Sequence, residues 1–328
     1  MKTILFTNVR DEHHILEWAI HHLNLGFTRI HIFDHLSIKP VKEIIKENIP
    51  NITIERLESK FANKSGLIIQ SCKYSIKNGY DWMLYLDGDE FLVLREDENV
   101  ESFLKKYENY QQVGINWLMF GSNHHEKLPY PNSTMIETYI KCNSLIDQHT
   151  KAFVRPNSVI GCGHPHIYKV KNPNLSVAST YDKLESPFYI NPKGMEIDKF
   201  NSYIAHFYYQ SYDTYIKRKM SRERDDIPNA KWPKTSREEF HSIFNDIENI
   251  ELKEKYNQKN IDTIKVFYNS NSNTKENEIE MKEYQEDEKE NTITPINNLN
   301  NLNINKNTLR LMSKLGNHLS KKACAKRF

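Results

Sequence analysis

Two carboxylates separated by one glycine, Asp87 and Asp89, are the residues of this sequence whose types and spacing most directly suggest chemistry. Carboxylate oxygens are the ligands that Mg2+ and Mn2+ prefer, and a diphosphate can fill the remaining coordination positions. Gly88 lets the backbone between the two acids turn and approach a ligand closely. A cation held there would neutralise the charge that develops on a diphosphate leaving group, so this step needs no protein nucleophile.

The acids, which continue into Glu90, follow a short apolar segment. Residues 82–86 predict a buried strand, and residues 91–94 predict the next strand. The acids would then lie at the carboxyl end of a strand, where open α/β sheets bind their ligands. An Asp-Gly-Asp sequence can also form an ordinary turn, but the strands on both sides favour a metal site.

Strand and helix patterns alternate along the chain before and after the acids. Residues 3–9 are apolar and β-prone, and Ile15, Trp18, Ala19 and Leu23 follow at helical spacing. Further strands are predicted at 29–33, 52–54, 113–120, 151–155 and 203–209, and further helices at 40–48, 62–78 and from Tyr212. The β-α-β-α-β order at the start predicts a parallel sheet of the nucleotide-binding type.

Several motifs resemble those of one known family. The segment 81–92 around the acids resembles the metal-site signature of family 2-like glycosyltransferases, specifically the branch related to glycosyltransferase family 92. Further segments resemble motifs of that branch in the same order, namely 8–12, 16–18, 21–26, 33–37, Trp117, 120–122, 151–156 and 206–208, with Ser211, Tyr215, Lys217 and Lys219. The resemblance extends from about residue 3 to residue 225, and several ordered motifs are more specific than any one of them.

The resemblance implies an α/β protein with the GT-A fold, in which helices cover both faces of a mostly parallel central sheet. It implies metal-dependent transfer of a sugar, with inversion, from a nucleotide-sugar to a hydroxyl acceptor. The expected donor is a uridine diphosphate (UDP) sugar, and the expected cofactor is Mn2+ or Mg2+. The acceptor would be a glycan, a protein or a lipid.

The resemblance also assigns residues to the donor by their place in the motifs. Asn8, Arg10, Glu12, Asp34 and Asp87 are expected to bind it. Glu12 and Asp34 would contact the nucleoside, with Asp34 accepting a hydrogen bond from the edge of the base. Asp87 would engage the ribose as well as the metal.

The metal ligands implied by the resemblance are Asp87, Asp89 and His206. His206 would complete the metal shell or lie near the diphosphate, and the alternative is a hydrogen-bonded core histidine on an apolar strand. The chain departs from the family at two positions, with Asp11 where Asn is usual and Lys39 where Asp is common. Both departures concern donor identity more than the fold.

An inverting transfer also needs a base that takes the proton of the acceptor hydroxyl. Glu126 follows the loop 121–125, in the region that usually faces the acceptor, and Glu137 is the second candidate. The alternative for Glu126 is a solvated loop acid, because charged residues are mostly exposed.

Two further clusters each have two interpretations. Residues 162–166 (Cys-Gly-His-Pro-His) could bind zinc, but they lack a second ligand pair at structural-zinc spacing, which favours a polar loop lining the donor cleft. The basic residues 217–219, Arg222 and Arg224 could supply cations to a diphosphate or form a solvated helix face.

Composition excludes several other classes of protein. The chain has 45 basic and 43 acidic residues, a balance that argues against a duplex-coating protein, so no nucleic acid partner is expected. The cysteines, Cys72, Cys142, Cys162 and Cys324, are too few and too widely spaced for a disulfide framework and favour a reducing compartment. The first apolar segment is too short for a signal peptide or a transmembrane span, so a soluble, cytoplasmic protein is expected.

Three regions are predicted along the chain: a GT-A domain at 1–268, a disordered low-complexity linker at 269–308 and a basic amphipathic tail helix at 309–328. The tail carries its apolar residues at helical spacing, at Leu309, Met312, Leu315 and Leu319. It could be a frayed helix, or it could make weak peripheral contact with a membrane.

Two other functions are compatible with parts of this pattern. One is a catalytically silent nucleotide- or glycan-binding module that kept the fold, which the intact acids disfavour. The other is a metal-dependent nucleotidyltransferase, which would need a basic phosphate-binding loop near the first strand. Residues 8–12 are instead a mixed, partly acidic turn without glycine.

Overall fold

The computed structural model describes residues 1–45, 49–59, 63–129, 133–164, 166–185, 189–190, 195–223, 231–232 and 234–269. The chain divides into two compact units, Met1–Asn271 and Ser272–Phe328, and all described residues lie in the first unit. The predicted tail helix at 309–328 and all of the predicted linker except Asn269 lie outside the described residues. The predicted domain boundaries therefore stay predictions.

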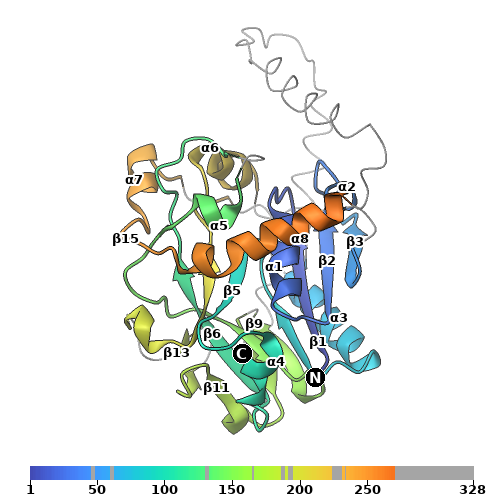
Figure 1. Ribbon diagram of the computed structural model, residues 1–328. Helices are drawn as coiled ribbons and strands as arrows, with labels where there is room; N and C mark the ends of the chain where they lie inside the picture. The colour runs from blue at the N-terminus through green and yellow to red at the C-terminus, as the bar shows by residue number, and fades with distance from the viewer. Residues whose placement is uncertain are drawn as a thin grey trace, which may run out of the picture. The chain divides into compact units, whose positions relative to one another are not determined.

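A mostly parallel sheet forms the centre of the first unit (Figure 1). Within the described residues it has nine strands in the order β3-β2-β1-β4-β8-β6-β14-β5, with β11 beside β6. These strands are β1 (Thr3–Val9), β2 (Arg29–His35), β3 (Ile52–Leu57), β4 (Trp82–Tyr85), β5 (Glu90–Leu94), β6 (Gln112–Met119), β8 (Thr150–Val154), β11 (Ser176–Ala178) and β14 (Ser202–His206). Only β8 and β5 run antiparallel to their neighbours.

Helices and short strand pairs surround this sheet. The helices are α1 (Ile15–Asn24), α2 (Val41–Ile44), α3 (Lys64–Lys77), α4 (Val100–Lys105), α5 (Met135–Thr138), α6 (Tyr212–Tyr215), α7 (Arg237–Ser242) and α8 (Gln258–Asn269). Turns of π-helix follow α6 at Ile216–Met220 and precede α8 at Lys253–Asn257, and turns of 3-10 helix lie at Pro156–Ser158, Pro173–Leu175 and Ile197–Lys199. The pairs are β7 (Lys141–Cys142) with β15 (Ile247–Glu248), β9 (Val159–His164) with β10 (Ile167–Val170), and β12 (Leu184–Glu185) with β13 (Tyr189–Ile190).

Both faces of the sheet are covered by helices. Trp18 of α1 packs in the same hydrophobic cluster as Leu5 of β1, whereas Ile68 of α3 packs in the cluster that contains Phe6. Because successive side chains of a strand point to opposite faces, α1 and α3 lie on opposite sides of β1. Helix α8 crosses α1 and packs against it (Figure 1), where Asn24 donates a hydrogen bond to Asn260. The predicted α/β architecture, with helices on both faces, is confirmed.

Most predicted elements are present, with changes at their ends. The strand predicted at 203–209 ends at His206, because the pairing with both partners stops there: β5 begins at Glu90 and β6 ends at Met119. The helix predicted at 40–48 ends at Ile44 in α2, and residues 46–48 lie outside the described residues. The helix predicted from Tyr212 begins there as α6 and continues into the π-helical turn.

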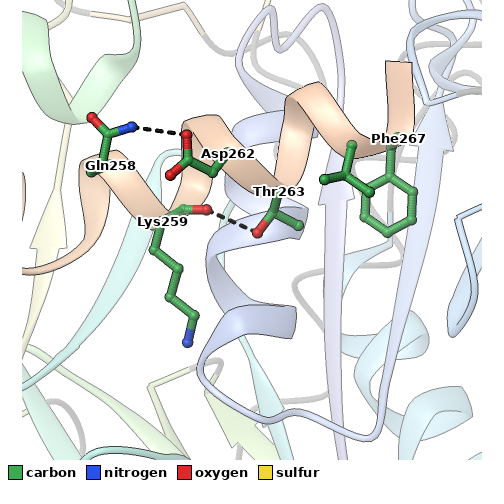
Figure 2. Close-up of a pocket in the computed structure, with 6 residues that line it drawn as sticks. Gln258, Lys259, Asp262, Thr263 and Phe267 are labelled. Carbon is green, nitrogen blue, oxygen red and sulfur yellow. Dashed lines mark hydrogen bonds between the residues drawn. The ribbon is translucent and has the colours of Figure 1, made fainter. Parts of the chain in front are cut away.

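An open groove of about 570 Å3 lies along α8, lined by Gln258, Lys259, Asp262, Thr263, Val266 and Phe267 (Figure 2). Gln258 donates a hydrogen bond to Asp262, and the Thr263 hydroxyl donates to the Lys259 carbonyl, so these polar groups bond within their own helix. None of the predicted site residues lines this groove. Among the described residues, no helix is long and apolar enough to span a membrane.

Candidate active site

The parallel strands bring most of the predicted site residues to one edge of the sheet. Asp34 is in the last part of β2 and pairs with Val9 at the end of β1, so Glu12 follows just beyond that edge. β4 runs parallel to β1, which places Asp87 at the same edge. His206 ends β14 and pairs with Glu90. Residues from the ends of four strands thus converge where open α/β sheets bind ligands.

Residues 87–90, called the loop of acids below, are packed tightly against the loop that follows β1. A Cβ atom added at Gly88 would lie 2.6 Å from Val9 Cγ1 and 3.3 Å from Glu12 Cγ. The first distance is too short for a real Cβ contact, so only glycine allows this close approach. The sequence predicted that Gly88 lets the backbone approach a ligand, and the structure shows a close approach to the neighbouring loop.

Asp87 is held by two lysines. Lys64 Nζ contacts Asp87 Oδ1, and Lys151 Nζ lies 2.9 Å from Asp87 Oδ2 and 3.2 Å from Glu90 Oε2. Burial would raise the pKa of Asp87, but Lys151 and Lys64 outweigh it and hold that pKa well below its usual range. Burial, with a contribution from Asp87, raises the pKa of Glu90 to about 7. Both oxygens of the first acid therefore face ammonium groups.

Asp89 faces a histidine. Asp89 Oδ1 lies 3.6 Å from His206 Nε2, and both side chains are buried. Burial lowers the pKa of His206 to about 4, so the imidazole is neutral near pH 7 and its nitrogen can bind a metal. Two ligand atoms that each lie ~2.1 Å from one ion are at most ~4.2 Å apart, so this pair fits a divalent cation.

The predicted ligand set of Asp87, Asp89 and His206 is only partly drawn together. Among the described residues, no group of three or more His, Cys, Asp and Glu side chains has an arrangement that could hold a metal ion. Asp87 is engaged by its lysines, so the remaining positions around a cation would fall to diphosphate oxygens and water. His206 is buried and its ring is directed at a carboxylate, so its role as a metal ligand stays a prediction.

Arginines from the basic segment after β14 secure the loop that follows β1. Arg218 Nη2 lies 2.7 Å from Glu12 Oε2, and Arg222 Nη1 lies 2.8 Å from Asp11 Oδ2. Burial raises the pKa of Glu12, against the opposing effect of Arg218. Asp11 has a φ of +53° and accepts a hydrogen bond from the Ile38 N–H at 2.7 Å. Two of the basic residues thus neutralise carboxylates of the protein itself. Neither interpretation of the sequence, as cations for a diphosphate or as a solvated helix face, predicted this.

Lys219 has different partners. Its Nζ lies 4.1 Å from the ring centroid of Tyr208 and 4.8 Å from that of Trp232. Within the described residues it makes no ion pair with a carboxylate, although Asp89 is near enough to influence it. Burial lowers the pKa of Lys219, and Asp89 opposes this effect. A lysine held on aromatic rings beside the acids is suited to bind an anionic ligand. Arg224, from the same predicted basic cluster, lies outside the described residues.

Asp34, one of the residues predicted to contact the nucleoside, already has hydrogen-bond partners within the protein. Asp34 accepts hydrogen bonds from the N–H groups of Ser37 and Val41 and from Arg56 Nη1, at 3.2, 3.0 and 2.8 Å. These bonds lower the pKa of Asp34 although burial alone would raise it. Asp34 therefore organises the loop between β2 and α2, and its contact with a base stays a prediction.

The two other residues assigned to the donor also lie beside β1. Asn8 is within that strand, and its Oδ1 accepts a hydrogen bond from the Tyr85 hydroxyl at 3.1 Å. Arg10 follows the strand and is partly exposed. Their roles toward a nucleotide stay predictions.

The two predicted bases lie in other surroundings. Glu126 Oε1 accepts hydrogen bonds from Arg237 Nε at 2.9 Å and from His241 Nε2 at 2.8 Å, and Arg237 and His241 lower its pKa. Glu137 is exposed in the first turn of α5, where its N–H bonds the Thr134 hydroxyl. Among the described residues, neither carboxylate shares an ion-pair partner with the acids that follow β4.

The segment 162–166 is described only in part, since Pro165 and the side chains of 162–164 lie outside the described residues. His166 is described, and its Nδ1 is 2.8 Å from the Thr150 carbonyl oxygen. Its ring lies 4.9 Å from that of Trp117, which also contacts His149 and His206. The predicted zinc alternative therefore gains no support from this histidine.

The acid and the histidine lie at the carboxyl edge of a mostly parallel sheet, the edge at which open α/β proteins bind their ligands. The profile of glycosyltransferase family 92 matches residues 1–259 of the chain. The chain therefore belongs to glycosyltransferase family 92, the family that its motifs resemble.

One relative is a glycosyltransferase family 92 protein of rice, Oryza sativa subsp. japonica. It is 22% identical over 216 residues, which cover 64% of this chain and 33% of the rice protein. The match thus spans about a third of the length of that relative.

Similarity to solved structures is weak. S. aureus TarS residues 1–349 has 14% identity and a TM-score of 0.31, covering 48% of this chain and 47% of that chain. A putative glucose-1-phosphate thymidylyltransferase from Bacillus anthracis has 12% identity and a TM-score of 0.31, covering 48% and 72%. Neither similarity is high enough to carry an argument.

Proposed function

We propose that this chain transfers a sugar from a nucleotide-sugar to a hydroxyl acceptor, with inversion and with the help of a divalent cation. The observation that carries the proposal is the pair formed by Asp89 and His206, 3.6 Å apart at the carboxyl edge of the sheet. The family supports glycosyl transfer, and the geometry of the pair supports a cation. A UDP-sugar is the proposed donor, because the motifs after β1 and β2 resemble those that bind uridine.

Each residue of the site has a proposed task. Asp89 and His206 would hold Mn2+ or Mg2+, which when bound neutralises charge on the diphosphate. Lys219, on its aromatic rings, would add a second positive group for the same leaving group. Asp87 would keep the loop of acids in place through Lys151 and could still contact the ribose.

The nucleoside would lie against the loops that follow β1 and β2. Asn8, Arg10, Glu12 and Asp34 are the residues proposed to contact it. Arg218 neutralises Glu12, so the nucleoside side of the site presents less net negative charge than its acids alone would give. The acceptor, a glycan, a protein or a lipid, would approach from the side of Trp117.

A screen of nucleotide-sugars tests this proposal directly. A ligand that binds only the folded state raises the melting temperature, so UDP-sugars with Mn2+ should stabilise the protein more than GDP-sugars do. Release of UDP from the stabilising donor should then require the cation and stop on chelation. No stabilisation by any UDP compound would contradict the donor. Binding of UDP without any UDP release would instead indicate a silent binding module.

A further inference from the structure

Trp117 on β6 is surrounded by three histidines. Its ring centroid lies 4.5 Å from that of His206, 4.9 Å from that of His166 and 5.1 Å from that of His149. The His149 ring stacks on the indole, with an interplanar angle of 24°. Because His206 lies beside Asp89, a single aromatic residue separates His149 from the proposed cation site.

His149 forms a pair with a carboxylate. His149 Nδ1 is 2.7 Å from Asp147 Oδ1, which also accepts the His149 backbone N–H at 2.8 Å. Burial would raise the pKa of Asp147, but the hydrogen bonds from His149 outweigh it and lower that pKa. The ionised carboxylate favours the tautomer with its proton on Nδ1, in which Nε2 carries the lone pair.

The pair keeps access to solvent, with 35% of the His149 side chain and 29% of the Asp147 side chain exposed. Substrate could therefore reach it. By contrast, the lysine two residues further along, Lys151, is only 1% exposed and binds Asp87. Alternate residues of an extended chain share a face, and both His149 and Lys151 lie against Trp117, the lysine Nζ at 5.7 Å from the ring centroid.

The backbone fixes this arrangement. The Trp117 N–H donates to the His149 carbonyl oxygen at 2.9 Å, and Asn116 pairs with Thr150 where β6 meets β8. The Asn116 side chain also donates to the Asp147 carbonyl oxygen at 2.8 Å. His149 is thus held beside Trp117 by strand pairing, which gives the precision that a catalytic group needs.

We propose that His149, oriented by Asp147, is the base that takes the proton of the acceptor hydroxyl. The inference rests on the proposed glycosyl transfer and names a residue for one of its steps. The acceptor O–H bond breaks, and its proton passes to His149 Nε2. The acceptor oxygen forms a bond to the anomeric carbon, while the bond from that carbon to the diphosphate oxygen breaks. The nucleoside diphosphate leaves with that electron pair, and Asp147 acts as a positioning residue that stabilises the imidazolium.

The carboxylate predicted from the sequence is less suited to this task. Glu126 is paired with Arg237 at 2.7 Å, and its pKa is lowered. A lower pKa makes a weaker base. His149 has its own carboxylate partner and the same Trp117 neighbour as His206.

UDP release from UDP-glucose, UDP-galactose and UDP-N-acetylglucosamine, with Mn2+ and a mixture of methyl glycosides as acceptors, tests the inference. His149→Gln should lower the rate of release by about 100-fold or more, the usual effect of losing a general base. Its Kd for UDP, measured by calorimetry with Mn2+, should stay within about two-fold of wild type. Asp147→Asn should lower kcat with little change in the KM for the donor, a split that a general loss of structure would not give.

His31→Gln is the matched control, because it removes another histidine that pairs with a carboxylate, Glu55 at 3.2 Å, away from the acids. It should release UDP at close to the wild-type rate. If His149→Gln releases UDP at a rate within about three-fold of wild type, the inference is overturned and the proposed function stays intact. The same holds if Glu126→Gln alone abolishes the release of UDP. Wild-type protein that neither binds nor releases UDP would overturn the proposed function and this inference together. If His149→Gln fails to fold, the kcat of Asp147→Asn decides, and an unchanged kcat overturns the inference.

Discussion

Lys151 and Asp87 come from neighbouring parts of the sheet, and their side chains meet with Nζ 2.9 Å from Oδ2. Lys151 also lies 3.2 Å from Glu90, and both of these side chains are almost completely buried. The first acid after β4 is therefore held by a protein cation, whereas Asp89, the second, is directed at His206. Two acids separated by one glycine therefore have different partners and different proposed roles.

Loss of the buried lysine should destabilise the protein strongly. Lys151→Met would leave Glu90 buried without its cation and would remove one of the two lysines that hold Asp87. Breaking a buried pair such as Lys151 with Glu90 costs about 3–5 kcal/mol. Urea unfolding measures the change. Lys105→Met is the control, because Lys105 pairs with Glu101 on an exposed helix surface. Similar unfolding midpoints for the two variants would contradict the role given to Lys151.

Gly88→Ala should damage both stability and donor binding. The added Cβ would lie 2.6 Å from Val9 Cγ1, and such overpacking costs about 1–3 kcal/mol. The loop of acids would have to move, so affinity for UDP should fall as well. At Gly161 the nearest atom to an added Cβ is 4.0 Å away, so Gly161→Ala serves as the control. A Gly88→Ala protein with wild-type stability and wild-type affinity for UDP would show that the close packing is unimportant.

Mild acid should destabilise the protein through its buried histidines. Burial lowers the folded-state pKa of His21 to about 4 from an ordinary value of 6.5, and burial also lowers that of His22. Between these values the unfolded chain binds more protons at the two histidines, so their contribution to the free energy of unfolding is largest above pH 6.5 and falls as the pH falls toward 4. Glu90, whose pKa is raised to about 7, acts in the opposite direction over part of this range. The lowered pKa values of Asp34 and Asp87 act only below their ordinary value of 3.8, outside this window.

Urea unfolding at pH 7, 6 and 5 measures this effect. His21→Asn removes one of the buried groups, so the variant should be less stable at pH 7 but lose less stability on acidification. An identical pH dependence in wild type and variant would rule out His21 as a cause.

Asp34→Ala should weaken uridine nucleotide binding. The carboxylate is expected to accept a hydrogen bond from the base, and it also organises its loop through Ser37, Val41 and Arg56. A lost charge-assisted contact of this kind corresponds to roughly a ten-fold rise in Kd. Arg56→Met separates the two roles, since it keeps the carboxylate but removes one loop contact. Calorimetry that gives Asp34→Ala the wild-type Kd for UDP would contradict the base contact.

The sequence predicts the fold well where an element is determined by its own residues, such as an apolar segment followed directly by turn residues. The strands around Asp87 and Asp89 could be placed because a continuous apolar segment ends abruptly in acids. The partners of these acids could not be assigned from the sequence. Lys64 meets Asp87 because of where α3 packs on the sheet, and Lys151 meets it because of the register in which β8 pairs. Lys151 does begin one of the matched motifs, and this was the available signal.

The predicted bases show the same limit. Glu126 is predicted from the sequence because it follows the loop 121–125, in the region that usually faces the acceptor, but ion pairing with Arg237 and His241 decides its surroundings. The sequence pattern Asp147-Gln-His149 just before a strand could have indicated a paired acid and histidine on one face. This pattern indicates a functional pair only once β6 and β8 pair and bring Trp117 against His149.

Calorimetric titration of UDP into wild-type protein, Asp89→Asn and His206→Gln, with and without Mn2+, shows whether Asp89 and His206 hold a cation for the donor. Asp97→Asn is the control, since Asp97 is a buried acid that pairs with Lys106 instead of lying in the site. We expect Mn2+ to tighten UDP binding in wild type and in Asp97→Asn but to have no effect in Asp89→Asn and only a weak one in His206→Gln. Equal enhancement by Mn2+ in Asp89→Asn and wild type would contradict a cation held by Asp89 and His206.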